Sequence, residues 1–111
     1  MTMIEIKAVV RPSRLDMLRA ALKKLPSFPG MTVAKVEGCS SSSTRHSSES
    51  GTIKQDLLDF SPKVMIHIVV EEPHAQAIYD AIIAATRTSR NGDGLVWMTR
   101  VEQCLFIAGA E

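Results

Sequence analysis

The segment 63–70, KVMIHIVV, constrains the fold of this chain more than any other stretch. In a strand, four of its apolar side chains would point to one face, and two apolar side chains with one histidine would point to the other. Strands that are apolar on both faces normally lie inside a sheet rather than at its edge. We therefore predict that residues 63–70 form a central strand.

Three further segments have the period of two that is typical of strands. They are residues 4–11, 31–37 and 95–100. Residues 101–107 are expected to form a short terminal strand or a turn. Together with residues 63–70, these segments predict a sheet of at least four strands.

Two segments between the predicted strands have helical spacing of their apolar residues. Leucines recur through residues 15–25, and Ser13, followed three residues later by Asp16, is predicted to cap this helix. A second apolar stripe runs through residues 78–85, and Pro73 occupies a favourable first-turn position for that helix. Both segments therefore predict amphipathic helices that pack on the sheet.

The order of the elements predicts a ferredoxin-like α+β sandwich, βαββαβ. Because crossovers of this kind are right-handed, both helices must lie on the same face of the sheet. The other face would stay bare and would present apolar side chains of the central strand. A bare apolar face favours self-association, so we expect a homo-oligomer.

A serine-rich segment, CSSSSTRHSSESG, separates the second and third predicted strands at residues 39–51. Seven of its thirteen residues are serine, so it has too little apolar surface to offset the entropy of ordering the chain. We therefore predict a long flexible loop over about residues 39–58. The loop would project from a single domain of residues 1–111.

Composition narrows the classes of partner. The chain has 13 Lys and Arg residues against 12 Asp and Glu residues, so no basic excess indicates binding to nucleic acid or to an acidic membrane. No apolar run approaches the roughly 20 residues that span a bilayer, and the N-terminus lacks the pattern of a signal peptide. Cys39 and Cys104 are far apart and are expected to be reduced thiols. These features predict a cytoplasmic protein that is not embedded in a membrane.

Four motifs resemble, in order and spacing, those of the PII signal-transduction family, also called nitrogen regulatory protein P-II. They are IKAVVRPSRLDMLRAAL near the start, GMTVAKVEG before the serine-rich segment, DFSPKVMIHIVV after it, and AATRTSRNGDG before the last strand. The resemblance implies a homotrimer that binds ATP or ADP, often with 2-oxoglutarate, in clefts between subunits. It also implies that the long loop, the T-loop of the family, carries a signal to a protein target such as a membrane transporter or an enzyme.

The resemblance implies a set of candidate nucleotide-binding residues. They belong to the adenine pocket, to the base of the T-loop and to the turn that approaches the ligand: Thr32, Val69, Gly38, Arg87, Thr88, Gly92, Asp93 and Gly94. Glycines in such a turn let backbone N–H groups come close to a phosphate. Without the family pattern, the sequence NGDG would predict only a tight turn between helix and strand.

Other polar residues receive different expectations. His67 and Arg90 are candidates for the ligand cleft, and the T-loop residues Ser41, Arg45 and His46 are candidate contacts with a protein partner. The spacing of the histidines fits no recognised metal site. No nucleophile motif or pair of carboxylates predicts catalysis, so no catalytic or metal-binding residue is assigned.

The sequence departs from the family where cations normally contact phosphate. Leu95 follows the Gly-Asp-Gly motif in place of the usual lysine, and Phe106 and Ala108 occupy the positions of an Arg-x-Arg pair. The loop base, Gly-Cys-Ser-Ser-Ser from Gly38, replaces Gly-Phe-Gly-Arg-Gln. A hydrogen bond to a charged group contributes about 1.5–3 kcal/mol, so these changes predict a weakened phosphate site. ADP, AMP or ATP remain the candidate ligands, and 2-oxoglutarate sensing is not expected.

These observations predict a regulatory protein rather than an enzyme. It would sense a small ligand in clefts between subunits and control a transporter or an enzyme through its T-loop. The alternative is a trimeric metal-tolerance or structural protein of the CutA type, in which the fold is kept and nucleotide binding is lost. Retention of the Gly-Asp-Gly turn favours the first reading, and loss of its lysine favours the second.

Overall fold

A computed structural model describes residues 1–39 and 60–109. The strands are β1 (Met3–Val10), β2 (Thr32–Gly38), β3 (Ser61–Glu71) and β4 (Gly94–Val101), and the helices are α1 (Leu15–Lys23) and α4 (Glu72–Thr86). The predicted order of strands and helices is confirmed. Of the T-loop candidates, Ser41, Arg45 and His46 lie outside the described residues, as does most of the predicted loop.

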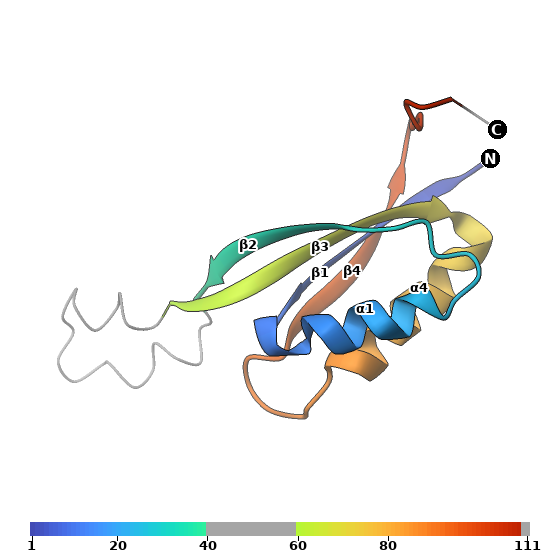
Figure 1. Cartoon of the computed structure of the whole chain (residues 1–111). Coiled ribbons are helices and arrows are strands. Elements are labelled where there is room, and N and C mark those ends of the chain that lie inside the picture. Colours follow the sequence, from blue (N-terminus) through green and yellow to red (C-terminus); the bar gives the residue numbers. More distant parts are fainter. Residues whose placement is uncertain (40–59, 110–111) are drawn as a thin grey trace, which may run out of the picture.

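The four strands form one antiparallel sheet in the order β2-β3-β1-β4. β3 pairs with β1 on one side and with β2 on the other, so the prediction that it is a central strand is confirmed. Both helices lie on the same side of the sheet, as Figure 1 shows. The arrangement is the predicted α+β, ferredoxin-like sandwich.

The hydrophobic core lies between this face of the sheet and the two helices. Alternate side chains of β1 and β3 are buried there against Leu18 and Leu22 of α1 and Ala75, Ile78 and Ile82 of α4. The period of two in the strands and the helical spacing of the leucines therefore serve the same core. β4 is less well covered, because Val96 and Met98 are only partly buried against the core.

The opposite face of the sheet is more polar than the sequence indicates. Glu5 of β1 pairs with Lys7, at 3.8 Å between Oε1 and Nζ, and with His67 of β3, at 3.6 Å between Oε2 and Nδ1. His67, a candidate for the ligand cleft, lies on this face, and about a third of its side chain is exposed in the single chain. This face carries a charged cluster in its middle, beside apolar neighbours such as Met65 and Val69.

The predicted cap of α1 is also wrong. Pro12 begins a short 3-10 turn (Pro12–Arg14) that precedes α1, and the N–H of Arg14 donates to the carbonyl of Arg11 at 3.0 Å. Ser13 is therefore inside that turn instead of at its N-cap, and no side chain caps either the turn or α1. The turn begins two residues earlier than a cap at Ser13 predicts, because proline favours the first position of a helical turn.

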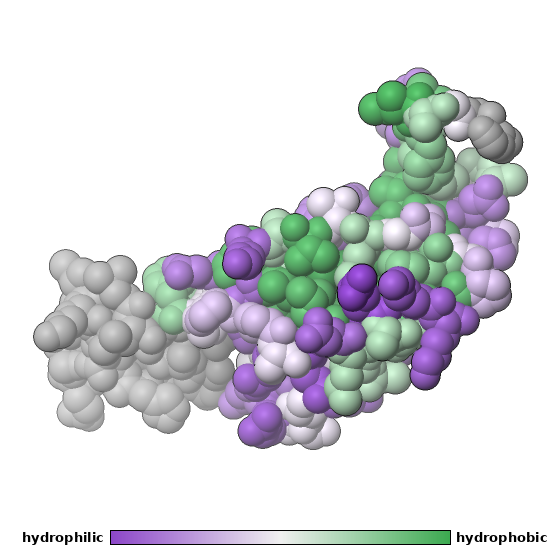
Figure 2. All heavy atoms as spheres, viewed as in Figure 1, coloured by the Kyte–Doolittle hydropathy of each residue, from purple (hydrophilic) through white to green (hydrophobic). Residues whose placement is uncertain are grey.

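The segment after β4 forms no strand up to residue 109, and of the two expectations for it only a turn is observed. The N–H of Gly109 donates to the carbonyl of Phe106 at 3.0 Å and closes that turn. Leu105, Phe106 and Ile107 are 72%, 54% and 95% exposed. Figure 2 shows hydrophobic atoms gathered at this end of the molecule.

Candidate functional site

The turn between α4 and β4, residues 87–94, contains most of the predicted ligand-binding residues. Its backbone needs left-handed conformations, with φ of 64° at Ser89, 93° at Gly92 and 100° at Gly94. A Cβ on Gly94 would overlap the carbonyl oxygen of Val9 in the adjacent strand. The glycine is therefore required by close packing of two strands, which is the structural role that the tight-turn reading of NGDG predicts.

Asp93 holds this turn together. Its carboxylate accepts hydrogen bonds from the hydroxyl of Thr88, from the N–H of Thr88 at 2.6 Å, from Nε of Arg11 at 3.3 Å and from the N–H of Arg90 at 3.4 Å. The bonds from the Thr88 side chain and backbone are the main cause that lowers the pKa of Asp93 well below its ordinary value. Asp93 is therefore ionised, and its oxygens are engaged by the turn and by Arg11.

Two cations that the sequence analysis missed fasten the turn to the sheet. Arg11, just after β1, donates from Nη2 to the carbonyl of Asn91, and Lys63, near the start of β3, donates from Nζ to the carbonyl of Gly92. Burial and then the nearby charge of Arg11 lower the pKa of Lys63 from its ordinary value. Positive charges are thus gathered at this end of the sheet.

Arg11 and Lys63 could have been suspected only from the strand pairing. Val10 pairs with Gly94 in β4 and with Val64 in β3, so the ends of three strands meet beside the turn. The residues joined are 80 and 29 positions apart in the chain, and no local motif links them. Arg11 directly follows Val10 and Lys63 directly precedes Val64, so each cation is a chain neighbour of a residue in this paired row.

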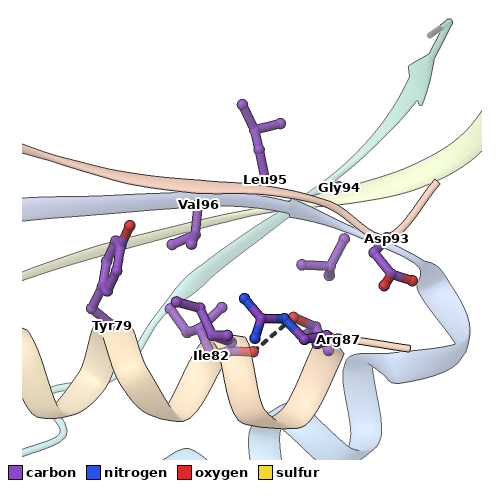
Figure 3. Close-up of a pocket in the computed structure, with 10 residues that line it drawn as sticks. Tyr79, Ile82, Arg87, Asp93, Gly94, Leu95 and Val96 are labelled. Carbon is purple, nitrogen blue, oxygen red and sulfur yellow. Dashed lines mark hydrogen bonds between the residues drawn. The ribbon is translucent and has the colours of Figure 1, made fainter. Parts of the chain in front are cut away.

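A cavity of about 340 Å³ lies beside the turn, between α4 and β4. Its lining includes Arg87, Asp93 and Gly94, three of the predicted ligand-binding residues. Figure 3 shows Val96 pointing from β4 toward α4 and Leu95 pointing to the other side of the strand. The side chain at the position of the family lysine is therefore on the face of the sheet that the helices do not cover, and it is 59% exposed.

The predicted residues fall into two groups in the single chain. The first group lies at the turn and comprises Arg87, Thr88, Arg90, Gly92, Asp93, Gly94 and Gly38. Gly38 belongs to this group because it lies against Lys63, which donates a hydrogen bond to Gly92. The second group comprises Thr32, His67 and Val69; Thr32 is paired with His67 on the uncovered face. Four to six residues along β3 separate Lys63 from His67 and Val69, which is about 13–20 Å in a strand.

Two further observations concern membrane-spanning helices and metal-binding clusters. None of the helices in residues 1–39 and 60–109 is long and apolar enough to cross a membrane. Within the same ranges, no group of three or more His, Cys, Asp or Glu side chains is placed to hold a metal ion.

The sheet order, the two helices on one face and the glycine turn define a ferredoxin-like domain of the kind that the PII motifs imply. The family model described as nitrogen regulatory protein P-II matches residues 3–111. Similar proteins include the nitrogen regulatory proteins P-II of Rhizobium meliloti (strain 1021), 30% identical, of Microchaete diplosiphon, 33% identical, and of Nostoc punctiforme, 32% identical. Each match covers 98% of this chain and 95% of the relative. The chain belongs to the nitrogen regulatory protein P-II family.

Proposed function

We propose that this protein is a cytoplasmic signalling regulator of the PII type, which senses an adenine nucleotide in clefts between copies of the chain. The observation that carries the proposal is the division of the predicted ligand residues into two groups about 13–20 Å apart on β3. A nucleotide could use both groups only if they came from two copies. The family resemblance implies a homotrimer, which would form three such clefts.

The uncovered face and the C-terminal turn support association of copies. Leu105, Phe106 and Ile107 are exposed in the single chain, and the uncovered face carries Met65 and Val69. Burial of apolar surface of this kind stabilises contacts between subunits by about 25 cal/mol per Å². A head-to-tail contact, in which different surfaces of each copy meet, closes into a ring.

The charge pattern at the turn supports a nucleotide with few phosphates. Arg11 and Lys63 lie beside the single carboxylate of Asp93, and Arg87 and Arg90 belong to the same turn, so an anion is favoured there. Arg11 and Lys63 already donate to carbonyls of the turn, and Leu95 offers no charge. We therefore expect AMP or ADP to bind at least as well as ATP, since additional phosphates gain few charge-assisted bonds.

The output of the regulator would be the segment over residues 39–58, acting on a protein target such as a membrane transporter. Lys63 provides a physical link, because its stem lies against Gly38 at the end of β2 and its ammonium group bonds to Gly92 of the turn. An anion bound at the turn would compete for this ammonium group. Ligand binding would then alter the contacts at the base of the segment, and the protein would regulate its target without catalysing a reaction.

Isothermal titration with AMP, ADP, ATP and 2-oxoglutarate, combined with light scattering, tests this proposal. We expect the mass of a trimer, saturable binding of AMP or ADP, no tighter binding of ATP and no heat from 2-oxoglutarate. A monomeric mass at micromolar concentration would contradict the cleft between copies. A folded trimer that binds no nucleotide would remove the sensing role and favour the CutA-type alternative.

A further inference from the structure

The cavity between α4 and β4 is lined by Arg87, Asp93 and Gly94 of the turn and by no member of the second group of predicted nucleotide residues. Thr32, His67 and Val69 belong to the face that the helices leave uncovered. The cavity opens on the helix side, where Val96 points toward α4 while Leu95 points away (Figure 3). A ligand in this cavity would therefore share the turn with a nucleotide but would not reach Thr32, His67 or Val69.

The cavity exists because β4 is an edge strand that α4 covers incompletely. Ile82 of α4 is 1% exposed and Val10 of β1 is 2% exposed, so the floor is apolar and fixed by the core. Val96 completes the floor from β4 and is only partly buried. The volume of about 340 Å³ is at the lower end of the range that small-molecule sites occupy.

Arg87 provides a cation to this cavity that the fold does not otherwise use. Figure 3 shows its side chain extending from the end of α4 into the space beside Ile82. No hydrogen bond or ion pair connects its guanidinium group to another residue in the ranges 1–39 and 60–109. Asp93, which also lines the cavity, directs its oxygens to Thr88, Arg90 and Arg11.

The end of α4 does not need the side chain of Arg87, although the N–H of Arg87 donates to the carbonyl of Ile83 at 3.0 Å. Arg14 donates from Nε and Nη2 to the carbonyl of Ala85, at 3.0 and 2.8 Å, and the Thr86 hydroxyl donates to the carbonyl of Ile82 at 2.7 Å. These bonds satisfy carbonyls that would otherwise attract a cation to the helix end. The Arg87 guanidinium group is consequently available to an anion in the cavity.

We propose that this cavity is a second ligand site, which binds a small organic monocarboxylate with a compact apolar body. The carboxylate would accept paired hydrogen bonds from the planar guanidinium group of Arg87, and the apolar body would contact Ile82 and Val96. The hydroxyl of Tyr79, which points from α4 toward the strands in Figure 3, would contact a polar substituent.

The test is a titration of the full chain, labelled with ¹⁵N, with isovalerate and with phenylacetate, followed by NMR. Saturable shifts are expected at the amides of Arg87, Gly94 and Val96 and at Nε of Arg87. The uncharged isostere isovaleramide and inorganic phosphate should each bind at least tenfold more weakly, because one lacks the charge and the other lacks the apolar body. Arg87→Gln should weaken carboxylate binding at least tenfold.

Arg90→Gln is the matched control, since it removes the same charge from the same turn but from a side chain that does not line the cavity. It should leave carboxylate binding within twofold. Arg87→Lys serves as the second variant if Arg87→Gln loses the dispersed spectrum of a folded chain. The proposal is overturned if neither carboxylate gives saturable shifts, if isovaleramide binds equally well, or if Arg90→Gln weakens binding as much as Arg87→Gln. AMP added in parallel separates the two ligands, because AMP should shift the amides of His67 and Val69 and the carboxylates should not.

Discussion

Replacement of Gly94 by alanine tests the claim that strand packing, and not only ligand binding, requires this glycine. Gly94 has φ of 100°, where a side chain is strained by about 1–2 kcal/mol. The added Cβ would also overlap the carbonyl oxygen of Val9, a backbone atom of a central strand. Overpacking of this kind costs a further 1–3 kcal/mol or so. The expected loss in the free energy of unfolding is therefore about 2–5 kcal/mol.

Gly30 offers a matched control for the Gly94→Ala variant. Its φ is 112°, but a Cβ at this position would have no neighbour within 4 Å. Gly30→Ala should therefore show the strain alone, about 1–2 kcal/mol. Both substitutions stiffen the unfolded chain equally, so that effect cancels in the comparison.

Thermal unfolding at one fixed protein concentration measures the difference between the two variants. A domain of this size loses about 4 °C for each kcal/mol, so Gly94→Ala should unfold roughly 8–20 °C and Gly30→Ala roughly 4–8 °C below the parent. The reasoning fails if Gly94→Ala loses no more than Gly30→Ala. In that case the overlap with Val9 is relieved without cost, and the glycine has no packing role.

Three further predictions concern charge. The bonds to Asp93 lower its pKa, so its stabilising effect should be complete above the unfolded pKa of about 3.9 and should be lost as the pH falls below that value. Asp93→Asn should make the free energy of unfolding depend less on pH between pH 5 and 2, measured by urea titration. Arg14→Met should lower the free energy of unfolding by about 1–2 kcal/mol through loss of the bonds to Ala85. Arg19→Met, at an exposed position in α1, should change it little in the same urea assay. Leu95→Lys should raise affinity for ATP about tenfold or more, and raise it less for AMP, in calorimetric titrations; equal gains for both nucleotides would contradict the proposed cause of weak triphosphate binding.

The strands and helices could be predicted because their patterns are local and strong. The double-faced apolar pattern of residues 63–70 identified β3 as central, and right-handed crossovers placed α1 and α4 on one face. The same reasoning overestimated how apolar the uncovered face is. The ion pair between Glu5 and His67 depends on which strands are neighbours, and no single strand reveals it.

The chemistry of the turn could be predicted only in part. The NGDG sequence indicated a tight turn, and the structure adds that Asp93 and Thr88 hold it closed. Arg11 and Lys63 could not be found from local motifs, because strand pairing brings together residues that are far apart in the chain. The proposed cleft needs a second copy, and no local pattern in the sequence sets the contact between copies.

The most direct test of the central claim is to mix two variants, each defective in a different group. Lys63→Ala removes the cation beside Gly92, and Val69→Asp places a negative charge in the second group. Each variant alone should fail to bind AMP or ADP. In trimers mixed at random, about one quarter of the clefts should contain both intact groups. The mixture should therefore bind AMP or ADP at about one quarter of its clefts. No recovery after native mass spectrometry has shown mixed trimers would contradict the cleft between copies, as would normal binding by Val69→Asp alone.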